Sequence, residues 1–533
     1  MIETSSDLEV DVLIIGSGIA GLTSAIYLLE QNLSVAIVSK EFSLLESNTY
    51  WAQGGIIYPV GDKSLQLDED IQIASHHTSN QESINLLTKY GAKVIDDILL
   101  KKAKSSFQRD SGGELSFTRE AAHAQSRIIY KDDRTGSEIE TSLWNYLNQY
   151  LGKGLIVLKQ FTALDLITPA HHGISLNHRY LKPQVLGAYL FSQTNNKVIK
   201  CLSKKTILAT GGIGSIFLHH TNSEGARGDG HAMASRAGAY MINMEFMQFH
   251  PTTFYRPSHH RRFLISEALR GEGGIIKDVR GNAFMHRFHV DCELAPRDVV
   301  SRAILQHLIE NGDEHVLLDI SHKDSSWIQK RFPTIYSYCL EQGIDITKDP
   351  IPVVPAAHYS CGGIWVDGNG CSSLSRLYAV GEVACTGLHG SNRLASTSLL
   401  EGMVWAYTAS MHIKETIDQE VIFPSNQLKD WVLGHEPVDL NLVSQDLSTL
   451  RQTMWNYVGI KRSKNRLMRG RAMFYELQDE IQKFYKNAVL NDQLIGLRNA
   501  VEVGFMVINA SMRNQKSEGC FYLEEDPKKI TIL

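Results

Sequence analysis

Four short segments of the chain concentrate polar residues of kinds that bind or transform a small anion. They cover residues 248–252, 266–273 and 295–298, and the fourth comprises His358 and Arg393. An arginine side chain presents a planar fork of N–H groups that fits a carboxylate. Two arginines, two histidines and a threonine that converge in the fold would therefore clamp a small dianion.

Each of these residues also has a structural interpretation. The whole role of Arg297 can be to pair with its neighbour Asp298. His250, which precedes Pro251, can be a loop histidine whose hydrogen bonds are satisfied. Spacing along the chain does not establish that the four segments meet. That depends on the elements that would position them.

The chain is organised around a stretch near its start. Residues 10–15, rich in Val and Ile, predict a buried parallel strand, and apolar residues at helical spacing follow. At the junction Gly16 permits a tight turn, Gly18 lets the backbone approach a pyrophosphate, and Gly21 lets the helix pack closely on the strand. Unpaired N–H groups of the first helical turn would face the phosphates. The stretch predicts a dinucleotide site, with a merely tight turn as the alternative.

The second predicted strand, residues 34–38, narrows the choice of ligand. NAD-binding units usually place an Asp or Glu about 20 residues beyond the glycines, for the ribose hydroxyls. Here the strand is followed by Ser39 and Lys40, and only then by Glu41. The acid is displaced or missing, and the pattern favours FAD over NAD.

Three further segments are predicted to lie near this site. Residues 47–55 have the composition of a loop, with small residues and a paired glycine, and residues 206–212 predict a buried strand that ends in small residues. Ligands bind at the carboxyl ends of such strands. Asp229 begins a predicted helix that extends to about Gly238, and it is either the helix cap or an acceptor for hydroxyl groups.

Other elements are predicted from periodicity. They are helices over 65–100 and 137–151, and strands over 155–158, 164–167 and 185–191. Ser137 and Glu140 predict a capping box at the start of the second helix. From about 243 to 350 the alternation of strands and helices gives way to irregular segments rich in His and Arg, which predicts an inserted domain.

Composition excludes several classes of function. The chain has 533 residues and a formal net charge of −5, which gives no electrostatic footprint for nucleic acid. No apolar run approaches the ~18 residues of a membrane-spanning helix, and residues 1–9 are acidic rather than a signal peptide. We therefore expect a cytoplasmic protein without nucleic-acid or membrane partners. The seven cysteines form no C-x-x-C motif, and the histidine pairs have no H-x-x-x-H partner, so no metal site is predicted.

Longer motifs add a family resemblance. They are W-A-Q-G-G at 51–55, Q-F-H-P-T at 248–252, E-A-L-R-G-E-G at 267–273, A-P-R-D at 295–298, P-A-A-H-Y at 355–359 and G-E-V-A-C-T-G-L-H-G-S-N-R at 381–393. With the glycine motif, they resemble the fumarate reductase/succinate dehydrogenase flavoprotein family, from about residue 9 to at least 470. This resemblance implies an α/β plus α fold: a Rossmann-like FAD-binding domain of residues 1–242 and 351–415, an inserted α+β capping domain of residues 243–350, and a C-terminal helical domain of residues 416–533.

The resemblance also implies which residues contact FAD. These are Gly16, Ser17, Gly18, Ile19, Ala20, Gly21, Lys40, Asn48, Thr49, Tyr50, Trp51, Ala52, Gln53, Gly54, Gly55, Asp229, Glu382, Ser398 and Leu399. Succinate dehydrogenase and the membrane-bound fumarate reductases carry a histidine in the loop before A-Q-G-G that bonds covalently to FAD. Asn48 stands at the matching position and cannot form that bond, so FAD is expected to be non-covalent.

The motif T-R-E at 118–120, followed by His123, selects among family members. It resembles the pattern T-R-E-G-G-H of the branch that oxidises L-aspartate, whose glutamate is expected to face the substrate ammonium. Glu120 would then pair with a group that succinate lacks. Ala121 and Ala122 replace the two glycines of that pattern, which bears on the backbone conformation of the loop.

The resemblance assigns roles to the polar segments as well. His250, Thr252, His358 and Arg393 would hold the carboxylates with Gln248 nearby, and Arg297 would transfer a proton through Glu267 and Arg270. The reaction implied is hydride transfer from Cα of L-aspartate to flavin N5, giving iminoaspartate. Reoxidation would use oxygen, giving hydrogen peroxide, or fumarate, giving succinate. The product would enter quinolinate and NAD synthesis, so quinolinate synthase is the functional partner implied.

Two other interpretations stay open. One is a soluble fumarate reductase or a succinate dehydrogenase flavoprotein subunit, against which Asn48 and Glu120 argue. The other is a non-catalytic flavin-binding subunit, which would have no need of both Arg297 and Arg393.

Overall fold

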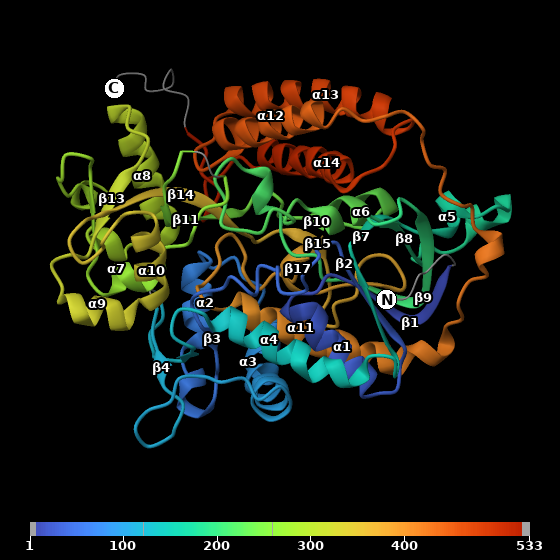
Figure 1. The fold of residues 1–533 in the computed structure, drawn as a ribbon, viewed down its shortest axis with the longest axis horizontal. Coiled ribbons are helices and arrows are strands. Elements are labelled where there is room, and N and C mark those ends of the chain that lie inside the picture. Colours follow the sequence, from blue (N-terminus) through green and yellow to red (C-terminus); the bar gives the residue numbers. More distant parts are fainter. Residues whose placement is uncertain (1–6, 121, 258–259, 525–533) are drawn as a thin grey trace.

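At the centre of the computed structural model, which describes residues 7–120, 122–257 and 260–524, lies a seven-stranded sheet (Figure 1). Its strands are β1 (Leu8–Ile15), β2 (Val35–Ser39), β6 (Leu155–Lys159), β7 (Phe161–Leu166), β8 (Gly187–Ser192), β9 (Val198–Leu208) and β16 (Leu377–Ala379). They follow the order β6-β2-β1-β9-β8-β7, and β16 also pairs with β9. β1 is parallel to β2 and β9, whereas β8 is antiparallel to both of its neighbours. The parallel part is the Rossmann-like unit expected from the sequence.

Two glycines build the turn between β1 and α1 (Ile19–Leu29). Gly16 has a φ of +121°, and a Cβ there would lie 2.1 Å from the carbonyl oxygen of Ala209, just beyond β9. A Cβ on Gly21 would lie 2.3 Å from the carbonyl oxygen of Gly16. Both distances are far below van der Waals contact. The close packing of helix on strand that the sequence predicts for Gly21 is therefore confirmed.

Replacing Gly21 with alanine is expected to lower the midpoint of thermal unfolding by about 5 °C, because the added methyl group must push α1 away from the turn. Differential scanning calorimetry would measure the shift. Gly368→Ala is the matched control, since a Cβ there would meet only Leu86, at 3.8 Å. A Gly21→Ala protein that unfolds at the wild-type temperature would contradict the packing argument.

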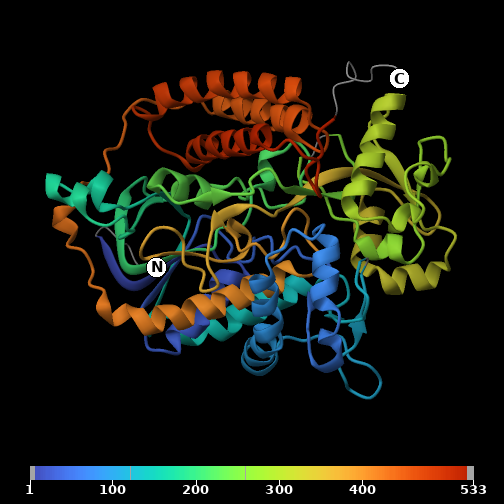
Figure 2. The ribbon, with the colours of Figure 1, turned by 180° about the vertical axis from the view of Figure 1, so that it is seen from behind.

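Helices cover both sides of the central sheet (Figures 1 and 2). On one side lie α1, α3 (Gln81–Val94), α4 (Thr135–Leu147) and α11 (Ser398–Thr416). On the other side, beyond α6 (Asp229–Ala237), lie α12 (Leu440–Val458), α13 (Lys464–Tyr485) and α14 (Asp492–Arg513). Among the helices of the described residues, none has the length and apolar character needed to cross a membrane.

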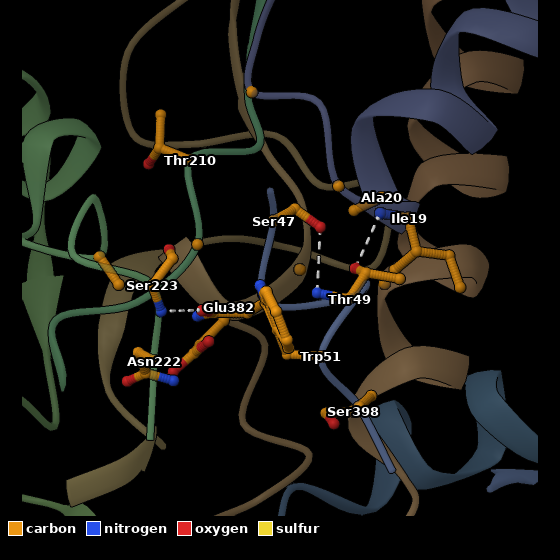
Figure 3. A pocket seen from close by; sticks show the side chains of 18 of the residues that line it. Ile19, Ala20, Ser47, Thr49, Trp51, Thr210, Asn222, Ser223, Glu382 and Ser398 are labelled. Atoms are coloured by element: carbon orange, nitrogen blue, oxygen red, sulfur yellow. Dashed lines mark hydrogen bonds between the residues drawn. The ribbon is translucent and has the colours of Figure 1, made fainter. Parts of the chain in front are cut away.

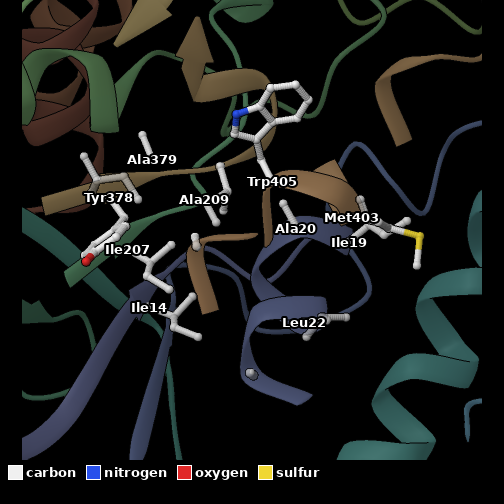
Figure 4. Packing of buried hydrophobic residues seen from close by; sticks show 14 of the residues in the cluster. Ile14, Ile19, Ala20, Leu22, Ile207, Ala209, Tyr378, Ala379, Met403 and Trp405 are labelled. Carbon is white, nitrogen blue, oxygen red and sulfur yellow. The ribbon is translucent and has the colours of Figure 1, made fainter. Parts of the chain in front are cut away.

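The largest apolar core lies between the sheet and the helices α1 and α11 (Figure 4). Ile14 of β1 and Ile207 of β9 face this core together with Ala20 of α1 and Met403 of α11. α1 and α11 lie far apart in the sequence, at residues 19–29 and 398–416. Burial of these side chains brings the two helices together. The core thereby packs the start of α11 against α1, where Gly402 lies within van der Waals range of Ala20.

A second, antiparallel sheet lies toward one end of the molecule (Figure 1). It has the order β11-β14-β13-β12, with β11 (Met247–Phe254), β12 (Ile275–Lys277), β13 (Val316–Asp319) and β14 (Ile351–Ser360). Helices α7 (Glu267–Gly271), α8 (Arg297–Asn311), α9 (Ser325–Arg331) and α10 (Pro333–Glu341) accompany it. β11 and β14 contribute to two cores: Phe254 and Val354 pack with the capping helices, and Phe249 and Ala357 with the C-terminal helices. The domain boundaries predicted from the sequence assign β11 and β14 to different domains, although the two strands are paired, and these boundaries stay a prediction.

Two predicted helices differ from the structure. The helix predicted over 65–100 is divided into α2 (Leu67–Ala74), α3 and a π-helix, η2 (Ile95–Lys102), because Asn80 caps α3 by accepting from the N–H of Glu82 at 2.8 Å. The helix predicted from residue 137 begins at Thr135 and ends at Leu147. Its capping box is wrong. Glu140 is buried and accepts from Ser47 Oγ at 2.6 Å, while Ser137 donates to the carbonyl oxygen of Arg134 at 3.0 Å.

Candidate active site

One cavity is lined by the glycine turn and by the first residues of α7 and α8. Its walls include residues 15–20, 38–41, 46–49 and 51–55, the ends of β9 and β16, and residues 221–223. At the other end its walls include His250, Glu267, Arg297, His358 and Arg393, which come from all four polar segments singled out in the sequence. The fold therefore brings these segments together.

The loop of residues 46–49 lies across the first turn of α1 (Figure 3). Glu140 of α4 accepts from Ser47 Oγ, and Ser47 Oγ in turn accepts from the N–H of Thr49 at 3.0 Å. The hydroxyl of Thr49 accepts from the N–H of Ile19 at 3.1 Å. The N-terminus of a helix carries partial positive charge and attracts anions. The contacts of Ser47 and Thr49 place oriented polar groups beside it.

Lys40, which is partly exposed, and the buried Asp229 form an ion pair in the same part of the cavity. Lys40 Nζ lies 2.5 Å from Asp229 Oδ2, and Arg227 Nε lies 3.1 Å from Asp229 Oδ1. Two residues of α14 complete the cluster: Asn499 donates to Asp229 at 2.8 Å, and Asp492 pairs with Arg227 at 2.7 Å. Burial acts to raise the pKa of Asp229, but Arg227 and Lys40 hold it well below its ordinary value. Asp229 is thus ionised.

Asp229 is the first residue of α6, and the N-cap is Gly228. The interpretation of Asp229 as a helix cap is therefore wrong.

Asn48 occupies a polar junction on the cavity wall. Its Oδ1 accepts from the N–H of Ser223 at 2.8 Å, and its side chain also bonds to Glu382. Glu382 accepts from the N–H of Ser360 at 3.0 Å, and burial raises the pKa of Glu382 to about 7. The amide of Asn48 is therefore held by hydrogen bonds on both sides.

Arg297 and Arg393 share one oxygen atom of Gln248. Arg297 Nη1 and Arg393 Nε each donate to Gln248 Oε1 at 3.3 Å. The amide nitrogen of Gln248 donates to Asn392 Oδ1 at 2.8 Å, which fixes the direction of the amide oxygen. Gln248 lies behind the wall and orients two cationic forks toward the same end of the cavity.

Glu267 joins Arg297 to a further arginine. Arg297 Nε donates to Glu267 Oε2 at 2.5 Å, and Arg270 Nη2 lies 3.0 Å from Glu267 Oε1. Burial acts to raise the pKa of Glu267, but Arg297 and Arg270 bring it below its ordinary value. Asp298 pairs instead with Arg302, at 2.8 Å. The alternative in which Arg297 merely neutralises Asp298 is thus wrong.

The two histidines at this end of the cavity are neighbours and are neutral. The rings of His250 and His358 have centres 5.4 Å apart. Nδ1 of His358 lies 2.8 Å from Thr221 Oγ1, and Nδ1 of His250 accepts from the N–H of Thr252 at 3.3 Å. Burial and the nearby arginines hold the pKa of both rings well below the ordinary value.

Glu120 lines the same cavity as Arg297 and Arg393. It accepts from Ser396 Oγ at 2.8 Å, and a Cβ on Gly54 would lie 2.8 Å from Glu120 Oε1, so the carboxylate packs where only glycine leaves room. Burial raises the pKa of Glu120, although Arg297 acts against this. In the same loop Ala122 has a φ of +65°, a conformation that glycine adopts more easily, while Ala121 lies outside the described residues.

Five of the residues predicted for the site do not line the cavity: Gly21, Tyr50, Gln248, Thr252 and Arg270. Thr252 donates its hydroxyl to the carbonyl oxygen of Ile265 at 3.1 Å and is fully buried. Its contact with the site passes through His250.

Conversely, the wall contains polar residues that were not predicted as site residues, among them Glu41, Ser223, Ser266, Tyr359 and Ser396. A signal existed for some of them, since Ser266 and Ser396 lie within the spans that supply Glu267, Arg393 and Ser398. Glu41, the acid that the sequence presented as displaced, also reaches the wall.

Known proteins resemble the chain in sequence and in fold. Residues 11–399 match the family model of the FAD binding domain. The L-aspartate oxidase of Acinetobacter baylyi is 40% identical over 533 residues, which cover 98% of this chain and 95% of that protein. The chloroplastic L-aspartate oxidase of Oryza sativa is 36% identical, with coverage of 98% and 83%. The solved structure of E. coli quinol fumarate reductase FrdA has a TM-score of 0.86 at 23% identity, covering 98% of this chain and 92% of that one.

The chain therefore belongs to the proteins with this FAD-binding domain and, among them, to the L-aspartate oxidase family. The cavity fits FAD: a helix N-terminus is available for the phosphates, and the wall beyond β2 carries Lys40 and Glu41. With Asn48 at the linking position, the residues present suit a cofactor that is held without a covalent bond.

Proposed function

We propose that the protein oxidises L-aspartate to iminoaspartate, and one observation carries this proposal. Two arginine forks share Gln248, and a carboxylate, Glu120, lines the same cavity close enough for both arginines to act on its charge. Two cationic groups and one anionic group match a molecule with two carboxylates and one ammonium. FAD, when bound, supplies the hydride acceptor at flavin N5.

The roles of the residues follow from their contacts. Arg393 and the neutral histidines bind the carboxylates, and Gln248 and Thr252 support them from behind the wall. Glu120 pairs with the ammonium group. Arg297 takes part in proton transfer, and Glu267 and Arg270 relay the proton away from the cavity. Together they orient Cα at near-attack distance.

The electron acceptors, the partner and the location extend this proposal. Oxygen would reoxidise the enzyme with release of hydrogen peroxide, and fumarate would do so with release of succinate. Quinolinate synthase, which takes up the product, is the functional partner, and the cytoplasm is the expected location. These assignments rest on the family resemblance, not on a surface of the protein.

An anaerobic absorption spectrum of the purified protein tests the proposal. L-aspartate should bleach the flavin band, whereas succinate in a separate cuvette should bleach it little, because succinate has no ammonium for Glu120. D-aspartate, which carries the same charges in the opposite configuration at Cα, is the control and should leave the flavin band unbleached. Bleaching by succinate alone would favour the dehydrogenase alternative, and a protein without a flavin band, or one bleached by no dicarboxylate, would overturn the proposal.

A further inference from the structure

A buried carboxylate that the proposed reaction does not use lies behind Arg393. Glu401 of α11 is 1% exposed, and its Oε2 accepts from Tyr359 Oη at 2.8 Å. Its Oε1 accepts from Thr386 Oγ1 at 2.6 Å, and its Oε2 lies 2.9 Å from His389 Nε2. Burial acts to raise the pKa of Glu401, but His389 and the hydrogen bonds hold it below the ordinary value. Glu401 is therefore negatively charged at neutral pH.

Tyr359 connects this carboxylate to the end of the cavity that holds the arginines. Cζ of Arg393 lies over the Tyr359 ring, 4.6 Å from its centre. A phenol that donates its hydrogen to a carboxylate has a more electron-rich ring, and a cation over such a ring is held more strongly. The charge of Glu401 thus acts on Arg393 through a single aromatic side chain.

The hydrogen bonds of the Arg393 guanidinium go to neutral groups. Its Nε donates to Gln248 Oε1 at 3.3 Å and its Nη1 to Ser398 Oγ at 3.1 Å. Gln248 is shared with Arg297, whose like charge repels Arg393. Tyr359 and Arg393 both line the cavity, so contact with the face of Tyr359 holds the guanidinium where it can bind a carboxylate in the cavity.

We propose that Glu401, acting through Tyr359, is a positioning residue that holds Arg393 in the plane in which it binds a substrate carboxylate. This inference rests on the proposed function and adds to it two residues that support the dicarboxylate site. Their effect is on binding of the dicarboxylate, since neither hydrogen-bonds to Arg297 or Glu120.

Two variants, Tyr359→Phe and Glu401→Gln, test the inference in the FAD-loaded enzyme. Fumarate is the binding probe, because oxidised flavin cannot reduce it, and its titration is followed by the change in flavin absorbance. Both variants should raise the Kd for fumarate and the KM for L-aspartate by about three- to tenfold. The kcat at saturating L-aspartate should stay within about twofold, since a correctly bound substrate meets the same reacting groups.

Tyr378→Phe is the matched control. It removes another buried tyrosine hydroxyl that bonds to α11, with His412 Nδ1 at 2.9 Å, and Tyr378 does not line the cavity. Its fumarate Kd should equal that of the wild type. The inference is overturned if folded Tyr359→Phe binds fumarate as the wild type does, or if Tyr378→Phe shows the same loss.

Two further results separate this inference from other failures. A folded Glu401→Gln enzyme with wild-type fumarate affinity would also overturn it, and if that variant does not fold, Tyr359→Phe decides. A wild-type protein that is not bleached by L-aspartate contradicts the proposed function alone, because the fumarate titration still reports how Arg393 is held.

Discussion

Replacing Arg297 with leucine should lower kcat for L-aspartate oxidation by about 10³-fold while FAD stays bound. The change removes a guanidinium that contacts both Glu267, at 2.5 Å, and the shared oxygen of Gln248, at 3.3 Å. It also leaves Glu267 paired with Arg270. Stopped-flow measurement of anaerobic flavin reduction gives the rate, and the flavin absorbance of the purified variant gives its FAD content.

Arg302→Leu is the control for this substitution. Arg302 lies on the same helix, α8, one turn further on, and pairs with Asp298 rather than with a residue of the site. Its loss should leave flavin reduction within about twofold of the wild type. If Arg297→Leu reduced flavin within tenfold of the wild-type rate, Arg297 would not have the central place that the geometry gives it.

The second large effect is expected for Glu120→Gln. Glutamine keeps the size of the side chain and can still accept from Ser396, so the charge is what changes. The loss of a charge-assisted bond to the substrate ammonium should lower kcat/KM for L-aspartate by about 100-fold. Fumarate has no ammonium, and fumarate reduction should change less than about threefold. Equal losses in the two assays would contradict the selective role of Glu120.

The pH dependence of the same enzyme offers an independent readout of Glu120. Burial raises the pKa of this carboxyl in the empty cavity, so the side chain is protonated below that pKa and ionised above it. The kcat/KM for L-aspartate should therefore rise with pH through the raised pKa, whereas the affinity for the fumarate dianion should fall over the same interval. Both trends should disappear in Glu120→Gln.

The parts of the fold that could be predicted are those determined by neighbours along the chain. The strand, glycine turn and helix at residues 8–29 follow from local periodicity and from the need for glycine at Gly16 and Gly21. The capping box of Ser137 and Glu140 failed because a distant partner decided the outcome. Glu140 turns inward to Ser47, 93 positions earlier in the chain.

The candidate site shows the same limit. Residue types and family motifs identified Gln248, Glu120 and Arg393, but not what holds them. Gln248 meets Arg393 across 145 positions, and Ser396 reaches Glu120 across 276. Thr252 has the right residue type and stands in the right motif, yet its hydroxyl donates to the carbonyl oxygen of Ile265 and does not line the cavity. Such directions are set by tertiary packing, which periodicity does not encode.

The cluster that joins Asp229 and Arg227 to α14 has a consequence for biosynthesis. Translation proceeds from the amino terminus, and the chain must therefore reach Asp492 and Asn499 before this part of the cavity has all its partners. The glycine turn is therefore synthesised long before α14, the helix that completes the wall of the cavity around Asp229. Binding of the cofactor by the complete cavity therefore requires translation to pass α14, and a ribosome that stalls before α14 leaves a chain with an incomplete cavity.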